Sequence, residues 1–291
     1  MEKKSRRWLT ITVLAITSLV FIGLSIYPMI EALMNQQKAT PTASNPTAPP
    51  TADSAETVQK EEEGYQLVLK RDPNNQSALQ GFVETRLKLI RLGLRKPKDV
   101  IEPLEKLTKL NPSQTIYATL LAQAYQQAGD SNAATQTYRN TLTQQPTNVD
   151  ALQGYVALLI QQKKSSEALD LLKNTMATAK QMNQQQAGSV DTPALELLMG
   201  DVYLSQQRSS EAMILYNRLQ KENPNDFRPV AAKGIVLRNE GKTEEAIALF
   251  KSAEALAPVQ VKEKIQQLIA QTQAAPVSPD VSASPAPQKS P

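Results

Sequence analysis

The sequence predicts an all-α fold in which helix-turn-helix repeats stack behind one N-terminal transmembrane helix. Pro112 and Pro146 are 34 residues apart, and so are Pro224 and Pro258. A fixed period of this length is typical of stacked two-helix repeats. The chain has 10 Gly against 19 Pro, and only 4% of its residues are aromatic, which favours helices ended by prolines over a β-sheet fold. Residues 8–30 contain no charged side chain, which predicts the transmembrane helix.

The uncharged run is long enough to cross a membrane. Its 23 residues, at 1.5 Å rise each, span a hydrocarbon core of ~30 Å. The alternatives are a cleavable signal peptide and a buried core helix. The run is longer than a usual signal sequence and no Ala-x-Ala-like site follows it, while Trp8 and the preceding basic residues are typical of a membrane flank. Those basic residues are Lys3, Lys4, Arg6 and Arg7.

The positive-inside rule sets the expected topology. It places residues 1–7, the basic tail, in the cytoplasm, and everything after the helix outside it, in a periplasm or a thylakoid lumen. Residues 31–58 are rich in Pro, Thr and Ala and predict a disordered linker, and residues 274–291 predict a disordered tail of similar composition. The repeats are expected to fill residues 59–273, as about four to five units and a C-terminal capping helix.

Two stretches of the chain, residues 115–148 and 227–258, carry small and aromatic residues at matching positions. The pattern resembles the tetratricopeptide repeat, a helix-turn-helix unit of 34 residues. The matching residues of the first unit are Leu121, Ala122, Tyr125, Gly129, Ala134, Tyr138 and Pro146, and those of the second are Gly234, Leu237, Gly241, Ala246, Phe250, Ala253 and Pro258.

Each residue type in this pattern has a physical role. The small residues let the two helices of a unit approach closely, and Tyr125, Tyr138 and Phe250 are expected to fill the gap to neighbouring units. Gly129 and Gly241 are expected to end the first helix in the left-handed conformation. One unit cannot bury its own apolar face, so at least three must stack.

The remaining units are less regular. Residues 149–182 and 193–226 fit the pattern with ten extra residues between them, where we expect a helix to run on toward Ala187, end at Gly188, and be followed by a helix capped by Thr192. Residues 76–112 contain a five-residue insertion around residues 91–96. Residues 60–73 fit a second helix only, as a half-repeat or an N-terminal cap.

Composition excludes most enzyme classes. The chain has no Cys and no His, and it has no phosphate-binding glycine motif, metal-ligand spacing or nucleophile motif. We therefore expect no enzyme activity, cofactor, metal or small-molecule substrate. The net charge is +4, of which residues 1–7 contribute +3, so that +1 remains for the rest. This argues against a nucleic-acid partner and against electrostatic lipid binding by the repeats.

The resemblance implies where a protein partner would bind, because the first helix of each repeat lines the concave surface in this family. In the N-terminal part those positions hold mostly uncharged polar residues: Gln80, Glu84, Thr119, Gln123, Gln126 and Gln153. They lack the Lys and Asn with which some relatives clamp a terminal carboxylate, so we reject that kind of site. In the C-terminal part the positions are more apolar, with two cations at one end: Leu197, Asp201, Leu204, Arg228, Ala231, Ile235 and Arg238.

The alternative is a purely structural role for these positions. Leu197, Leu204 and Ile235 can equally be packing contacts between neighbouring helices, and the glutamines can be solvent-exposed residues without a binding role. The acidic run Glu61–Glu63 is interpreted as solvated.

These features predict a membrane-anchored protein-interaction scaffold that helps to assemble or target a membrane-protein complex, with membrane-associated proteins as partners. In composition the chain is similar to anchored repeat proteins of cyanobacterial thylakoid and plasma membranes that serve photosystem and pigment–protein biogenesis. The alternative is a periplasmic, chaperone-like accessory of secretion or cytochrome maturation.

Overall fold

The computed structural model describes residues 55–274, and all secondary structure within them is helical. These residues form twelve α-helices and one short 3-10 helix, which fall into two compact units that divide between Asp191 and Thr192. The predicted all-α repeat fold is confirmed for this part of the chain. The predicted transmembrane helix at residues 8–30 lies outside the described residues, and no helix within residues 55–274 is long and apolar enough to span a bilayer.

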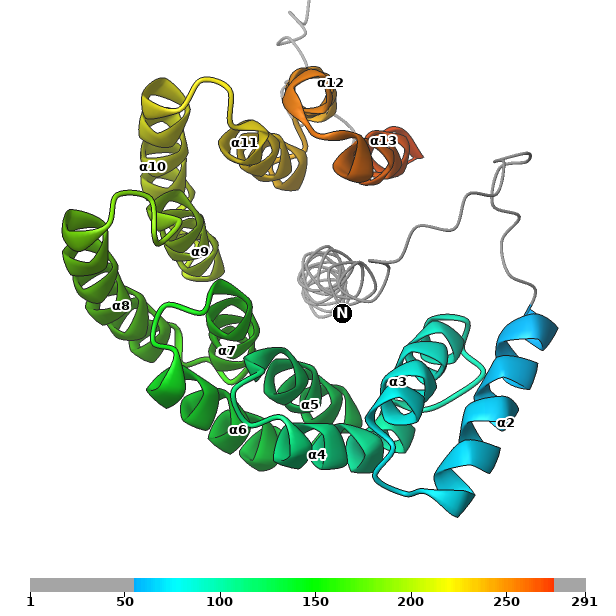
Figure 1. Ribbon diagram of the computed structural model, residues 1–291. Coiled ribbons are helices and arrows are strands. Elements are labelled where there is room, and N and C mark those ends of the chain that lie inside the picture. The colour runs from blue at the N-terminus through cyan, green and yellow to red at the C-terminus, as the bar shows by residue number, and fades with distance from the viewer. Residues whose placement is uncertain (1–54, 275–291) are drawn as a thin grey trace, which may run out of the picture. The chain divides into compact units, whose positions relative to one another are not determined.

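The first unit begins with α2, which includes residues 55–58 that composition assigned to the linker. Successive helices lie side by side, α2 against α3 and α5 against α6 (Figure 1). Its helices are α2 (Ala55–Arg71), α3 (Gln76–Arg91), η1 (Pro97–Val100), α4 (Ile101–Leu110), α5 (Thr115–Ala128), α6 (Ser131–Gln144), α7 (Val149–Gln161) and α8 (Ser165–Gln185).

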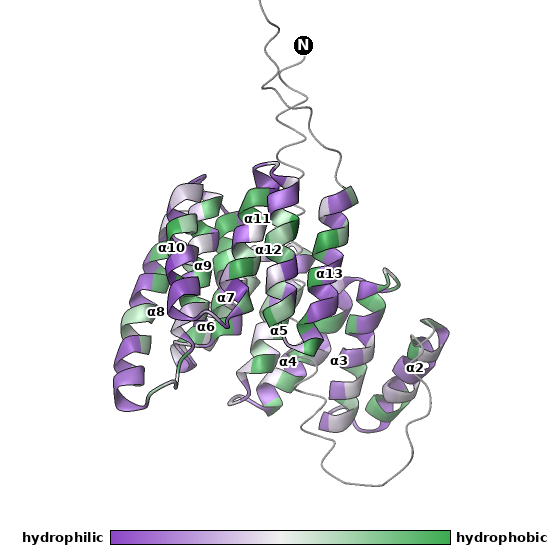
Figure 2. Cartoon of the chain, turned by 90° about the horizontal axis from the view of Figure 1, so that it is seen from above, coloured by the Kyte–Doolittle hydropathy of each residue, from purple (hydrophilic) through white to green (hydrophobic). Residues whose placement is uncertain are grey.

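Residues 192–274 of the second unit form five helices, in which α9 packs on α10, α11 on α12 and α12 on α13. Hydrophilic and hydrophobic residues are interspersed along the helices (Figure 2), as in helices that bury only one face in a core. The helices are α9 (Thr192–Ser205), α10 (Ser209–Glu222), α11 (Phe227–Asn239), α12 (Thr243–Leu256) and α13 (Val259–Ala274), the last in the place of the expected capping helix.

The first regular repeat folds as its sequence predicts. Gly129 has a φ of +90° and ends α5, because a left-handed residue turns the chain without a Cβ penalty. Asp130 then caps α6 by accepting a hydrogen bond from the backbone N–H of Ala133 at 2.9 Å. Gly241, with a φ of +80°, follows α11 in the same way in the second regular repeat.

The aromatic residues divide into two arrangements. Tyr138 of α6 lies against Gly154 in the next repeat, and Tyr125 donates a hydrogen bond to Glu105 in the preceding helix, α4, at 2.5 Å. Both fill gaps between repeats, as predicted. Phe250 differs, since its ring lies against Gly234 of its own repeat, and its contact with a neighbouring unit stays a prediction. The glycine leaves a space between the two helices that the ring fills.

The ten-residue insertion forms an extension of α8 and a tight turn. The helix ends at Gln185, before the expected Ala187, and Gly188 has a φ of +74°. The side chain of Asn183 holds the turn: its Nδ2 donates to the carbonyl of Val190 at 2.9 Å, and its Oδ1 accepts from the N–H of the same residue at 2.8 Å. The next helix begins at Thr192, the expected capping residue, one residue before the expected first position at Pro193.

Candidate protein-binding site

The apolar candidate surface lies on the two adjacent first helices of the second unit, α9 and α11. Leu197 and Leu204 are half-buried, and both pack against the core cluster around Tyr216 and Val236. Part of each side chain remains accessible, so each serves packing and can still contact a partner. Ala231 of α11 is also half-buried.

Ile235 differs from its neighbours because only 8% of its surface is exposed. In the free chain Ile235 is therefore a packing contact between helices, and its side chain has little surface to offer a partner. Contact of this residue with a partner stays a prediction.

The charged members of this surface have specific environments. Arg228 pairs with Asp226, the N-cap of α11, with Nη2 and Oδ2 2.8 Å apart. Burial raises the pKa of Asp201 to about 7, and the neighbouring Tyr216 offsets only part of this effect. Burial likewise lowers the pKa of Arg238 from its usual value. The charged forms of Asp201 and Arg238 are therefore poorly solvated, and an oppositely charged group of a partner would stabilise them.

The polar candidate surface lies on α3, α5 and α7 of the first unit. Two of its glutamines are already bonded: Gln80 Nε2 donates to the Tyr117 hydroxyl at 2.5 Å, and Gln126 Nε2 donates to Gln161 Oε1 at 3.2 Å. Gln123 is different, because it is 8% exposed and its buried Oε1 has no hydrogen-bond partner among the described residues. A buried acceptor left unpaired is costly to folding, but this oxygen is enclosed in the free chain, so Gln123, like Ile235, has little surface to offer a partner.

The other three predicted residues of this surface are less distinctive. Gln153 is half-buried on α7. Thr119 is fully buried and donates its hydroxyl to the carbonyl of Thr115 at 3.0 Å, so it does not line a surface, contrary to expectation. Glu84 forms a 3.2 Å ion pair with Lys88.

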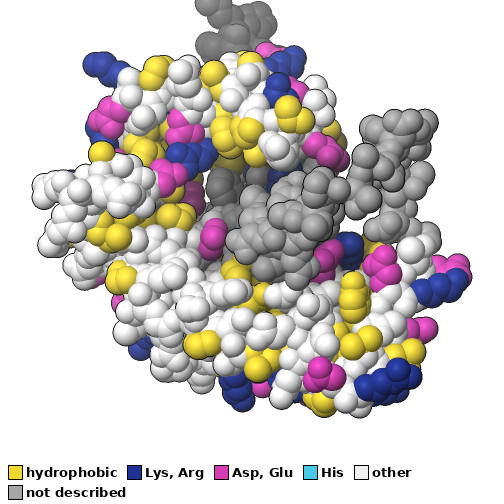
Figure 3. All heavy atoms as spheres, viewed as in Figure 1, with side chains coloured by type: hydrophobic (Ala, Val, Ile, Leu, Met, Phe, Trp, Pro, Cys, Tyr) yellow, Lys and Arg dark blue, Asp and Glu magenta, His cyan; other side chains and the backbone are white. Residues whose placement is uncertain are grey.

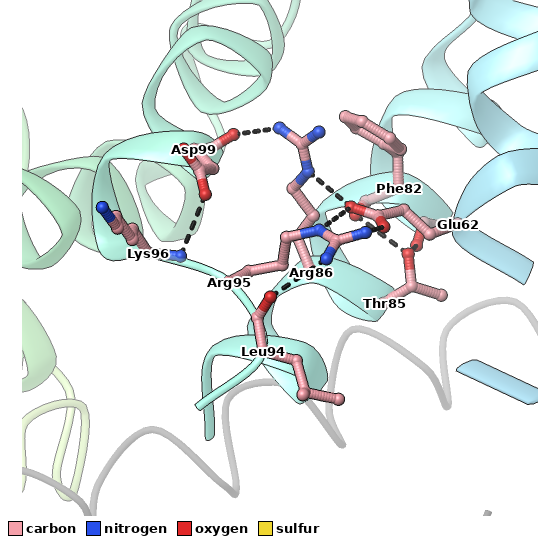
Figure 4. Close-up of polar contacts among 9 residues, drawn as sticks. Glu62, Phe82, Thr85, Arg86, Leu94, Arg95, Lys96 and Asp99 are labelled. Carbon is pink, nitrogen blue, oxygen red and sulfur yellow. Dashed lines mark hydrogen bonds and ion pairs between the residues drawn. The ribbon is translucent and has the colours of Figure 1, made fainter. Parts of the chain in front are cut away.

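A buried ion cluster in the first unit was missed from the sequence (Figure 4). Within the run Glu61–Glu63, interpreted as solvated, Glu62 is only 4% exposed. Arg86 Nε and Arg95 Nη2 each lie 2.7 Å from its carboxylate oxygens. Burial alone would raise the pKa of Glu62, but the hydrogen bonds and charges of the two arginines outweigh it and lower that pKa.

One signal could have revealed the cluster. Val58 and Glu62 are four residues apart and therefore share a helix face, and Val58 is buried. That face packs on α3, which carries Arg86.

Outside these surfaces, a cleft of about 450 Å³ opens between α6, α7 and α8. Arg139 Nε donates to the Tyr155 hydroxyl at 2.8 Å in its wall. Its lining comprises Arg139, Leu142, Thr143, Tyr155, Leu159, Glu167 and Leu171. On the face drawn in Figure 3, acidic and basic side chains are interspersed. No group of three acidic side chains within residues 55–274 could hold a metal ion.

Comparison with known proteins decides the family. A tetratricopeptide repeat family model matches residues 89–257, more than half of the chain. The chain belongs to the tetratricopeptide repeat family. Tetratricopeptide repeat domains bind protein partners and are typically non-enzymatic, so the chain is a protein–protein interaction scaffold.

Solved structures with the tetratricopeptide repeat fold agree. A tetratricopeptide repeat protein from Parabacteroides merdae superposes with a TM-score of 0.53 at 16% identity, over 84% of this chain and 90% of that one. Yeast Tom70 superposes with a TM-score of 0.50 at 15% identity, over 77% of this chain and 44% of that one. At such identities the likeness is one of fold alone. No curated protein matches the sequence.

Proposed function

We propose that the chain is a membrane-anchored scaffold that holds a protein partner and assists the assembly or targeting of a membrane-protein complex. The family supports protein binding, and the uncharged run at residues 8–30 supports the anchor. Anchoring raises the local concentration of a membrane partner, so that a weak contact is sufficient. A role in photosystem or pigment–protein biogenesis rests on composition only and is the narrowest form of this proposal.

The observation that carries the proposal is the half-buried face of α9 and α11. Leu197, Leu204 and Ala231 each keep part of their surface accessible, and Arg238 is poorly solvated beside them on α11. This combination fits a partner helix with an apolar face and one acidic end, because pairing would relieve the desolvated guanidinium.

One observation favours the alternative, a periplasmic chaperone-like accessory. The first unit presents the half-buried Gln153, whose amide can donate to and accept from the main chain of any extended peptide. A surface of this kind would hold unfolded chains with little regard for their sequence.

Site-specific photo-crosslinking in intact membranes separates the two functions. A photoreactive residue is placed at Ala231, at Gln153, or at the exposed Ala248 of α12 as the control position. Capture of one defined subunit of a membrane complex from Ala231 supports the scaffold. Capture of many secreted, unfolded chains from Gln153 supports the chaperone-like role. If neither position captures more than Ala248 does, both assignments of the surface are wrong.

A further inference from the structure

The turn after α3 gathers cations and exposed leucines in one short stretch of the first unit. Residues 85–98 contain six basic residues and no acidic one. Within this stretch the side chain of Leu92 is 55% exposed and that of Leu94 is 40% exposed. The six basic residues are Arg86, Lys88, Arg91, Arg95, Lys96 and Lys98.

Three of these cations face solvent without an ion pair to any residue of the described chain. Arg86 and Arg95 share Glu62, and Lys88 pairs with Glu84. The nearby Asp99 carboxylate accepts a hydrogen bond from the backbone N–H of Lys96 at 2.9 Å. The exposed cations that remain are Arg91, Lys96 and Lys98. We call residues 91–98 the basic turn.

The backbone of the basic turn is held in a fixed shape. Gly93 has a φ of +73°, and the N–H of Leu94 donates to the carbonyl of Leu89 at 2.8 Å, which closes the C-terminus of α3. Arg95 then fastens the turn to Glu62, while the side chain of Leu94 points away from that carboxylate (Figure 4). A preorganised turn loses little conformational entropy when it docks.

We propose that the basic turn docks on the surface of a membrane that contains anionic lipids. Leu92 and Leu94 enter the interfacial layer, and the three unpaired cations contact the lipid headgroups. Two exposed leucines among cations fit a lipid interface, whose acyl chains can bury both side chains, better than the sugar–phosphate backbone of a nucleic acid, which is polar and charged. The net charge of only +1 for residues 8–291 conceals this patch, because it averages the basic turn with acidic residues elsewhere in the chain.

The inference rests on the anchoring part of the proposed function, since residues 8–30 would bring the turn close to a bilayer. It does not depend on the protein partner or on the α9 and α11 surface. Crosslinking from Ala231 and lipid docking of the basic turn are therefore tested separately.

Tryptophan fluorescence of the full chain in vesicles tests the proposal. The chain has a single Trp, so Leu92→Trp in a Trp8→Phe background places one reporter in the basic turn without removing its apolar character. We expect a blue-shifted emission and quenching by brominated acyl chains in phosphatidylcholine vesicles containing phosphatidylglycerol, and neither in pure phosphatidylcholine. Ile214→Trp in the same background is the matched control, because Ile214 is 69% exposed but lies on α10 in the other unit.

The charge dependence supplies the second measurement. Each of Arg91→Gln, Lys96→Gln and Lys98→Gln should lower the ratio of docked to free turn about fivefold, and the three together on the order of 100-fold. A reporter that stays unquenched in anionic vesicles, or is quenched equally in neutral ones, refutes the proposal.

Two further outcomes would also count against the basic turn. If the chain floats with neither kind of vesicle, the anchor and the turn are both refuted. If the glutamine variants lose a crosslinked protein while quenching is unchanged, the turn is a protein contact.

Discussion

The ion cluster of Glu62 makes a quantitative prediction about how α2 is held. Glu62→Gln preserves side-chain volume but removes the charge that Arg86 and Arg95 share. Removing one partner of a fully buried pair costs about 3–5 kcal/mol. Because the Arg95 side chain is 35% exposed and can be solvated, we expect a smaller loss of about 2 kcal/mol in the free energy of opening α2. That corresponds to an opening equilibrium about 30-fold more favourable.

Amide hydrogen exchange of the full chain in detergent measures this opening helix by helix. Exchange of the α2 amides should be about 30-fold faster in Glu62→Gln, while α5 and α6 should not change. The neighbouring variant Glu61→Gln is the control, since Glu61 is exposed. Equal acceleration by both variants, or none by Glu62→Gln, would show that the cluster does not hold α2.

The same cluster sets a pH dependence with a definite sign. The pKa of Glu62 lies below its ordinary value of 4.5 in the folded chain, so its ionised form is favoured by folding. This stability is present above the ordinary value and is lost as the pH falls through the lowered pKa. Exchange of α2 should therefore accelerate relative to α5 under acid conditions in the native chain, and this difference should be absent in Glu62→Gln.

Four other substitutions test packing and buried charge, with Gly64→Ala as the control for Gly154→Ala. Gly154→Ala should cost about 1–3 kcal/mol of stability, because its new methyl would overlap the fully buried Tyr138 ring. Gly64→Ala lies at an open helical site and should gain about 0.5–1 kcal/mol. Thermal melting followed by circular dichroism compares the two variants. Asp201→Asn should stabilise the second unit by about 1–2 kcal/mol at pH 8 and have little effect at pH 4. The reason is that burial raises the pKa of Asp201 to about 7, so its ionisation destabilises the fold as the pH rises. Amide hydrogen exchange at both pH values measures this difference. Ile235→Asp should lower the melting temperature sharply, since it buries an unpaired charge, and a variant that melts like the native chain would reopen the site as a surface.

Local sequence was sufficient to predict where the helices of a repeat end, because the residues that end them lie within one unit. Gly129 and Gly241 end helices through their own backbone conformation, so their roles follow from type and position. The direction in which Phe250 packs depends instead on Gly234, sixteen residues away, whose missing side chain leaves the space. The period locates both residues but does not say which gap the ring fills.

The candidate sites were less predictable because burial depends on neighbours in space. Repeat register places Leu204 and Ile235 on equivalent faces, yet the structure leaves the first half-buried and buries the second. The Glu62 cluster unites three residues from α2, α3 and an insertion that interrupts the repeat pattern. Such an insertion has no counterpart in the period, so its contacts cannot be inferred from the other units.

The position of the cluster in the chain suggests why α2 needs a charged attachment. Twenty-four residues separate the predicted membrane helix, which ends at residue 30, from α2, which begins at Ala55. If the linker is a flexible coil, as its composition predicts, it would reach about 25–30 Å, and in the proposed anchored state this would keep the first unit near the bilayer. A pulling force between the predicted anchor and a bound partner would act first on α2, because α2 is the first helix after the linker. Because Arg95 joins Glu62 to the basic turn, the attachment that resists this load also fixes the turn that we propose to meet the lipid surface.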